Sequence, residues 1–374
     1  MLGVWGDGLV AEGLGARRCR GCPGLLGSGD RDDVGGGCGM TRATGALLGL
    51  AIGDAMGFPT EFNTFAQIEA EFGEWRSLPL PVSSGTAYVT DDTQMTLALG
   101  EALHTVLAGG PLTAGRMEPP VRAHFLSWYH SPENNRAPGG TCLRACEALE
   151  RGGPWQRASV VGSKGCGANM RVAPIGLVPG LSAEQRSGAA QLQSGLTHGH
   201  PTALAAGDVT AHTVHLLVQG TDPQDLLPLL RAYAEANRTV YRADWLGNLA
   251  EHAQDVDRVS FISRGWQECL AVLDRVEAAL PDADPDADPC LATGEGWIAE
   301  EAFATALFCF LQHPDDPPAA VRRGAYSGGD SDSIAALAGA FAGACHGAAA
   351  WPPEWVEVIE YRERLLALGA AWDQ

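Results

Sequence analysis

The sequence has few segments in which apolar and polar residues alternate, little isoleucine, and no uninterrupted apolar run long enough to span a bilayer. Because a half-buried strand needs an apolar residue at every second position, the first absence excludes a fold built mainly on β-sheets. The missing apolar run excludes a membrane-spanning helix, which needs about 20 such residues. The N-terminus also lacks the charged start and apolar stretch of a signal peptide. We therefore expect a cytoplasmic protein.

Basic residues are scarce as well. The chain has 25 Lys and Arg against 45 Asp and Glu, which gives a net charge of −20. An acidic surface repels a nucleic-acid backbone, so we do not expect non-specific DNA or RNA binding. Bound metal ions can neutralise part of this charge. The ten cysteines show no repeating spacing, and Cys19 and Cys22 form half of a metal knuckle without a second half, which indicates a reducing compartment rather than a disulfide scaffold.

Apolar residues recur at helical spacing from Thr41 onward, and this spacing predicts an all-α fold. Among the predicted helices are 246–256 and 355–372. Residues 1–39 are rich in glycine and have no sustained periodicity, which predicts a disordered N-terminal extension. Met40 then opens a different composition and could mark the true start of the protein. No internal repeat divides the remainder, so we expect residues 40–374 to form a single domain.

Two short acidic motifs precede predicted helices. Residues 328–333 (Gly-Gly-Asp-Ser-Asp-Ser) lead into a helix of small residues at 334–346, and residues 90–93 (Thr-Asp-Asp-Thr) lead into a helix at 94–108. Asp, Ser and Thr are common helix caps, and capping explains either motif alone. Clustered carboxylate and hydroxyl oxygens are also the ligands that hard cations such as Mg²⁺, Mn²⁺ and Ca²⁺ prefer. The presence of two such motifs in one chain favours a shared metal site.

The segment 41–56 is predicted to be a helix with glycine at every fourth residue of its middle part. Glycines at this spacing lie on one face of a helix, where a neighbouring backbone can approach closely. This close-packing face ends at Asp54, and Glu61 follows in the next loop. Taken alone, Asp54 is explained by hydrogen bonding at the end of its helix, and Glu61 by exposure to solvent.

Residues 162–171 (Gly-Ser-Lys-Gly-Cys-Gly-Ala-Asn-Met-Arg) form the glycine-rich loop of the chain. Its backbone N–H groups, with charge from Lys164 or Arg171, could hold a phosphate. The loop lacks the residue order of a P-loop and does not lie between a strand and a helix, so an ordinary tight connection explains it better when it is taken alone. His198, in the turn Thr-His-Gly-His-Pro, is a candidate metal ligand or substrate contact.

Taken in their order along the chain, these motifs resemble those of the ADP-ribosylglycohydrolase family, the all-α enzymes that include dinitrogenase-reductase-activating glycohydrolase. The resemblance extends from Thr41 to the C-terminus and depends mainly on the two acidic motifs. It implies a compact orthogonal bundle of many helices around a binuclear Mg²⁺ or Mn²⁺ centre in an ADP-ribose cleft. It also implies metal-dependent hydrolysis of the glycosidic bond at the anomeric carbon of the distal ribose, with release of ADP-ribose. The partner is then an ADP-ribosylated protein or small molecule, and we expect a monomer.

The resemblance also implies roles for individual residues. The metal ligands would be Thr90, Asp91, Asp92, Asp330, Asp332 and Ser333. Glu61 matches the family's acid in the loop after the first helix and is, with Asp91 and Asp92, a candidate for activating the water. The diphosphate and the distal ribose would lie against a loop made of Gly165, Cys166, Gly167, Ala168 and Met170. His198 matches a histidine near the same pocket. The family more often has Asn in place of Cys166, so we expect backbone contacts there rather than a side-chain contact.

Two other functions fit parts of the sequence. A catalytically silent ADP-ribose binder or structural relative is one alternative, although such a protein has no chemical need for the whole set of acids. A metal-dependent phosphoesterase is another, but the sequence lacks the His and Asp clusters that such sites use. The motifs address only the ADP-ribose half of a substrate, so they do not distinguish among arginine, serine, O-acetyl and guanidino linkages. We expect residues 59–85 and 131–141 to form the walls that discriminate among them.

Overall fold

A computed structural model of the chain describes residues 41–255 and 257–373. Within these residues all regular elements are helices, and extended segments meet only at isolated bridges, such as that between Ala87 and Ile359. The all-α prediction is confirmed. Among the described helices, none is long and apolar enough to cross a membrane. The predicted disordered extension, residues 1–39, lies outside the described residues.

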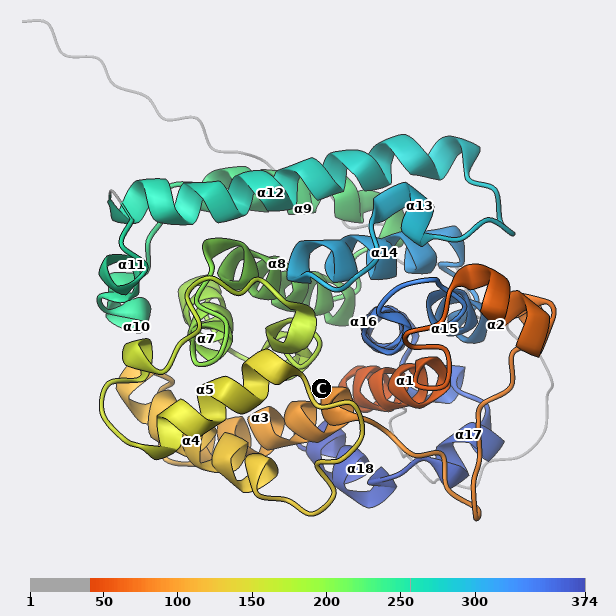
Figure 1. Ribbon diagram of the computed structural model, residues 1–374, viewed down its shortest axis with the longest axis horizontal. Coiled ribbons are helices and arrows are strands. Elements are labelled where there is room, and N and C mark those ends of the chain that lie inside the picture. Colours follow the sequence, from red (N-terminus) through yellow and green to blue (C-terminus); the bar gives the residue numbers. More distant parts are fainter. Residues whose placement is uncertain (1–40, 256, 374) are drawn as a thin grey trace, which may run out of the picture.

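Two helices from opposite ends of the described chain form the centre of the fold. Helix α1 (Arg42–Gly57), red in Figure 1, packs along α16 (Ser331–His346), in blue, and every residue of α1 is buried. The helices packed around this pair are α3 (Asp91–Ala108), α6 (Ala173–Leu177), α8 (Pro201–Val218), α14 (Ala299–Gln312), α15 (Pro317–Ala325) and α18 (Arg362–Ala370). The fold thus brings together helices from the two ends of the described chain.

Further helices form outer layers on two sides. The long helix α12 (Arg258–Ala279) covers α8 and α14, with α9 (Leu226–Asn237) beside it (Figure 1). On the other side, α4 (Ala114–Tyr129) packs against α3, and α5 (Gly140–Glu150) packs against α4. The remaining helices are α2 (Phe65–Phe72), α7 (Ala183–Gly195), α10 (Ala243–Leu246), α11 (Leu249–His252), α13 (Cys290–Thr293) and α17 (Pro353–Val358).

Two helix predictions are wrong because a residue with positive φ interrupts the pattern. The predicted helix 246–256 is replaced by α10 and α11, which are separated at Gly247 with a φ of 57°. The predicted helix 355–372 is divided into α17 and α18 at Tyr361, whose φ is 58°. A residue in this left-handed conformation cannot continue a right-handed helix, although the apolar spacing runs on beyond it.

Glycine allows the backbones of α1 and α16 to touch. A Cβ atom on Gly49 would lie 2.2 Å from the carbonyl oxygen of Gly339, and one on Gly339 would lie 2.0 Å from the carbonyl oxygen of Gly49. At the end of α1, a Cβ on Gly57 would lie 2.4 Å from the Cα of Asp332. No side chain fits at these positions, so the predicted close-packing face is confirmed. The contact places the loop after α1 directly beside the second acidic motif.

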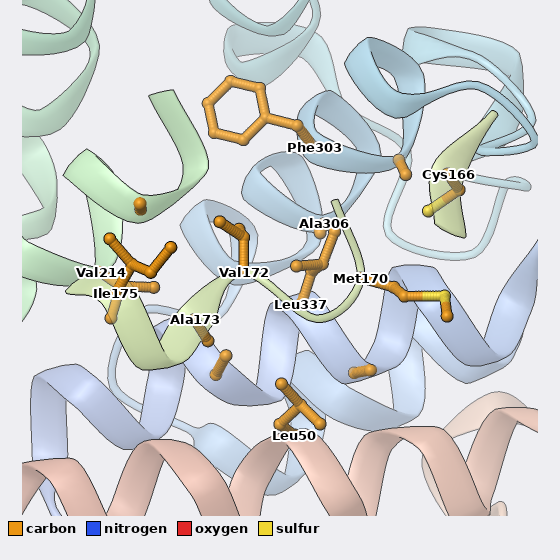
Figure 2. Close-up of a cluster of buried hydrophobic side chains, with 14 of the residues drawn as sticks. Leu50, Cys166, Met170, Val172, Ala173, Ile175, Val214, Phe303, Ala306 and Leu337 are labelled. Atoms are coloured by element: carbon orange, nitrogen blue, oxygen red, sulfur yellow. The ribbon is translucent and has the colours of Figure 1, made fainter. Parts of the chain in front are cut away.

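An apolar cluster joins this central pair to the glycine-rich loop. Figure 2 shows Leu50 of α1 and Leu337 of α16 with Val172, from the segment that follows the loop. All three side chains are fully buried. Cys166 and Met170 lie at one end of the same cluster (Figure 2). The glycine-rich loop therefore packs against the buried core and is not a free surface loop.

We predict that Gly49→Ala lowers the free energy of unfolding by about 3 kcal/mol, because the added methyl group must push two backbones apart. Gly339→Ala should cost a similar amount. Gly115→Ala in α4 is the matched control, since a Cβ there meets no atom within 4 Å, and it should change stability by less than about 1 kcal/mol. Denaturant titration of the three variants measures these differences. Equal stabilities for Gly49→Ala and Gly115→Ala would contradict the proposed role of the contact.

Candidate active site

The starts of α3 and α16 meet at one place. Helix α3 begins at Asp91, earlier than predicted, so Asp91 and Asp92 lie in its first turn rather than ahead of it. Helix α16 begins at Ser331, which places Asp332 in its first turn. The hydroxyl of Thr90, at the N-cap of α3, lies 3.5 Å from a carboxylate oxygen of Asp332. Helix N-termini carry partial positive charge that favours carboxylates, and here two of them serve one group of acids.

Asp54, in the last turn of α1, holds the start of α3. Its carboxylate is fully buried and accepts hydrogen bonds from the backbone N–H groups of Thr90 (2.9 Å) and Thr93 (3.0 Å) and from both hydroxyl groups (2.8 and 2.6 Å). The predicted hydrogen-bonding role of Asp54 is therefore confirmed, but its partners belong to a different helix. Because Thr90 donates its proton to Asp54, its oxygen lone pairs are left on the side of Asp92 and Asp332.

Three carboxylates lie close enough to share one ion. Glu61, Asp330 and Asp332 each offer an oxygen within 4.8 Å of the others. One oxygen of Glu61 and one of Asp92 are buried and have no hydrogen-bond partner in the part of the chain that the structure describes. Hard divalent cations such as Mg²⁺ and Mn²⁺ prefer a group of oxygen ligands of this kind. The residues present therefore fit a divalent cation.

A cavity of about 300 Å³ opens beside these acids. The predicted site residues that line it are Glu61, Asp91, Asp92, Asp330, Asp332 and Ser333 from the acidic group, and Gly165, Cys166, Gly167, Met170 and His198 from the loop and the turn. Thr90 and Ala168 do not line it, because both are fully buried behind its wall. A second cavity, of about 480 Å³ around Leu227 and Leu280, is lined by no acidic residue.

Two aromatic residues at the acid-lined cavity are absent from the predicted set. Phe62 follows Glu61 directly, and its ring stacks on that of Trp297 with centroids 5.4 Å apart. Phe62 is 71% exposed and has a φ of 66°, which is unusual for a bulky residue. Phe62 lies within residues 59–85, which we expect to form a wall of the site, and its position next to a candidate catalytic acid is the signal that could have singled it out. Residues 137–142 also line the cavity, as expected for the loop 131–141.

The two basic residues of the glycine-rich loop do not face the cavity. Lys164 forms ion pairs with Glu268, at 2.6 Å, and with Glu300. Arg171 is fully buried and donates a hydrogen bond of 2.9 Å to the carbonyl of Gly167. The interpretation in which either side chain supplies charge to a phosphate is not supported. Both instead hold the loop in its shape.

Comparisons with known proteins agree with this geometry. A family model described as ADP-ribosylglycohydrolase matches residues 40–373. The chain belongs to the ADP-ribosylglycohydrolase family. It is 28% identical to ADP-ribosylarginine hydrolase Tri1 of Pseudomonas putida (strain GB-1), over 88% of this chain and 77% of that protein. It is 27% identical to ADP-ribosyl-[dinitrogen reductase] glycohydrolase of Rhodospirillum rubrum, over 86% of this chain and 91% of that protein.

A solved structure shows the same fold as this chain. It is titled ADP-ribosylglycohydrolase-related protein complex, and it matches with a TM-score of 0.62 and 24% identity over 89% of this chain and 96% of its own. The family resemblance predicted from the acidic motifs is thus confirmed.

The acids at the cavity have pKa values above their usual range. Burial, followed by the charge of Asp332, raises the pKa of Glu61 to about 9. Burial raises the pKa of Asp91 to about 8, although a hydrogen bond from the N–H group of Gly139 opposes the shift. Burial and the charge of Asp332 also raise the pKa of Asp54 to about 7. Like-charged carboxylates are thus held together at a cost that a bound cation would relieve.

We predict that the cation-free protein loses stability as the pH rises. Because these pKa values are raised, the folded protein keeps protons that the unfolded chain releases near pH 4. Burial lowers the pKa of His198 to about 3, and this acts in the opposite direction up to about pH 6.5, so we expect the free energy of unfolding to fall between about pH 7 and about pH 9. Mg²⁺ or Mn²⁺ should reverse the loss, since it binds the ionised acids of the folded state. Thermal denaturation across this range, with EDTA and with each cation, measures both effects. A Tm in EDTA that increases with pH would show that the sign is wrong.

Proposed function

We propose that the chain is a hydrolase that cleaves the glycosidic bond at the anomeric carbon of the distal ribose in ADP-ribosyl conjugates and releases ADP-ribose. The observation that supports this best is that both acidic motifs, the glycine-rich loop and His198 border a single cavity. Its acidic end suits the hydroxyl groups of a ribose, and a glycine-rich loop allows close approach of a diphosphate, with the N–H group of Cys166 already bonded to the carbonyl of Trp297 at 3.1 Å. The names of the two relatives, both hydrolases of ADP-ribosyl groups, support the same reaction.

We further propose that the acidic end holds two Mg²⁺ or Mn²⁺ ions. The ligands would be Thr90, Asp91 and Asp92 at the start of α3, and Asp330, Asp332 and Ser333 at the start of α16. The hydrogen bond from the Thr90 hydroxyl to Asp54 supports this set, because it directs the proton away and leaves the threonine oxygen, which also accepts from the N–H group of Asp92 at 3.4 Å, a lone pair for a ligand bond. Such ions, when bound, can orient vicinal ribose hydroxyls and lower the pKa of a bound water.

Glu61 is the acid best placed for general acid–base catalysis. It lines the cavity, and one of its oxygens has no hydrogen bond to any described residue. Cleavage develops positive charge on the ribose, which a nearby carboxylate stabilises. As the water oxygen bonds to the anomeric carbon, the carboxylate takes the water's proton; the acceptor leaves with the bonding electrons and takes up a proton from solvent, and the carboxyl then returns its proton to solvent. Asp91 and Asp92, which also line the cavity, are the alternative bases.

Among the possible acceptors, arginine receives the most support. The relative from Pseudomonas putida is named for ADP-ribosylarginine. The exposed ring of Phe62 gives a planar guanidinium a face on which to stack, and Glu61 supplies negative charge beside it. A serine linkage offers no such cation. Action as a cytoplasmic monomer stays a prediction.

A panel of substrates tests the reaction. We expect ADP-ribosylarginine and a small guanidino conjugate, incubated with the protein and Mg²⁺ or Mn²⁺, to release ADP-ribose faster than ADP-ribosylserine or O-acetyl-ADP-ribose, as followed by chromatography. Faster release from the serine conjugate would overturn the acceptor assignment but not the reaction. Binding of ADP-ribose without release from any substrate would favour the catalytically silent binder.

We predict that Asp332→Asn lowers the rate of ADP-ribose release at least about 100-fold. The variant should bind fewer Mn²⁺ ions, counted by electron paramagnetic resonance. It should fold normally, because it removes one charge from a crowded group of like charges. Asp315→Asn is the control, since this carboxylate is exposed and remote from the cavity lining, and its rate and metal count should not change. Full activity of Asp332→Asn would sink the metal assignment.

A further inference from the structure

His198 is held rigidly against the glycine-rich loop. Its backbone N–H donates to the carbonyl of Ser194 at 2.8 Å, and its segment forms a parallel bridge with Val160. A Cβ atom on Gly165 would lie 3.4 Å from Nε2, and one on Gly167 would lie 3.2 Å from Cε1. The ring therefore packs edge-on against two glycines of the loop. The side chain lines the acid-lined cavity and is 2% exposed.

The other ring nitrogen of His198 ends a chain of buried hydrogen bonds. Nη2 of Arg171 donates to the hydroxyl of Thr197 at 2.8 Å, and this hydroxyl lies 2.8 Å from Nδ1 of His198. A guanidinium can only donate, so the threonine oxygen is the acceptor in the first bond. Thr197 is fully buried, and Nδ1 is the one atom in reach of its proton among the described residues. A proton on Nδ1 would leave the hydroxyl proton buried without an acceptor, which is costly.

Arg171 cannot turn away from Thr197, because its other N–H groups are held by hydrogen bonds. Its Nε donates to the side-chain oxygen of Gln193 at 2.9 Å, its Nη1 to the carbonyl of Gly167 at 2.9 Å, and its Nη2 also to the carbonyl of Gln193 at 3.0 Å. The guanidinium stacks on the ring of Phe125, with its central carbon 4.4 Å from the centroid. These contacts fix the orientation of the guanidinium, so Nη2 of Arg171 stays directed at Thr197.

We propose that Arg171 and Thr197 are positioning residues that fix His198 in its Nε2–H tautomer, which makes the ring a neutral hydrogen-bond donor to an oxygen of ADP-ribose. The identity of the ligand depends on the proposed function, whereas the tautomer does not. Arg171 thereby acts on the ligand through two intervening side chains rather than by contact.

The electrostatic setting agrees with a neutral ring. Burial, followed by the positive charges of Arg171 and then Arg144, lowers the pKa of His198 to about 3. The ring therefore carries a single N–H proton at neutral pH. The nitrogen that holds this proton determines whether Nε2 presents a hydrogen-bond donor or a lone pair to the cavity. The opposite tautomer would present a lone pair, which is repulsive toward the oxygens of a diphosphate because these can only accept hydrogen bonds. Fixing the tautomer in advance removes that unproductive population before the ligand arrives.

The tautomer is tested in the ligand-free protein by nitrogen NMR of ¹⁵N-histidine-labelled protein, with the His198 signals assigned by their loss in His198→Gln. We expect wild type to carry its proton on Nε2 and Thr197→Val to show a shift toward Nδ1. Thr197→Ser, which keeps the hydroxyl, should restore the wild-type signals. A proton on Nδ1 in wild type, or identical signals in wild type and Thr197→Val, would overturn the proposal whatever the protein catalyses.

The donor role is tested by calorimetric binding of ADP-ribose in the presence of Mg²⁺. We expect Thr197→Val to weaken binding about tenfold, as for one lost hydrogen bond, and Thr197→Ser to bind like wild type. Thr213→Val is the matched control, because Thr213 is also fully buried and its hydroxyl donates to the carbonyl of Val209 at 2.8 Å, within α8. Equal losses in both valine variants would reduce Thr197 to a structural residue. No binding by wild type would overturn the donor role and the proposed function together, while the tautomer result stands apart.

Discussion

The contact between the backbones of α1 and α16 is the constraint on which the rest of the structure depends. At Gly49 and Gly339 each helix places a carbonyl oxygen where the other would carry a side chain. Helices this close have no freedom to slide or rotate, since any shift brings Cα and carbonyl atoms into collision. The same face continues to Gly57, which packs on Asp332. Backbone packing thus sets the position of the candidate ligands at the start of α16, while hydrogen bonds to Asp54 set that of the ligands at the start of α3.

Two buried threonines then give the site its hydrogen-bond directions, with opposite results. The hydroxyl group of Thr90 donates a hydrogen bond to Asp54, away from the cavity, and this leaves a lone pair of the Thr90 oxygen for a cation. Thr197 accepts a hydrogen bond from Arg171 and donates one to Nδ1 of His198, so the N–H group of the imidazole ring faces the cavity. In each case a fully buried charged residue outside the cavity decides what a lining or neighbouring group presents to it. Preorganisation of this kind saves the ligand the cost of ordering the site.

The sequence predicts the parts of this arrangement that are local. Spaced glycines, clustered acids and a glycine-rich loop each have a direct physical meaning, and both acidic motifs and the glycine face lie where they are expected. Contacts between remote segments are harder to predict. Lys164 is turned from the cavity by Glu268 and Glu300, which come from other helices. The stacking of Phe62 on Trp297 joins two loops of irregular shape, and α7, which has a largely polar sequence, is buried by its neighbours rather than by its own apolar face.

The union of α1 with α16 also matters while the chain is being made. Helix α1 leaves the ribosome first, yet its glycine-lined face has little intrinsic helical stability and finds its partner only when α16 has been synthesised. Asp54 and Glu61 are synthesised equally early, and Asp330 and Asp332, which complete the group of acids, are added only with α16. A product of premature termination therefore lacks both the central packing of the domain and half of its oxygen ligands. Synthesis through α16 thus becomes a precondition for the central packing and for the complete group of acids alike.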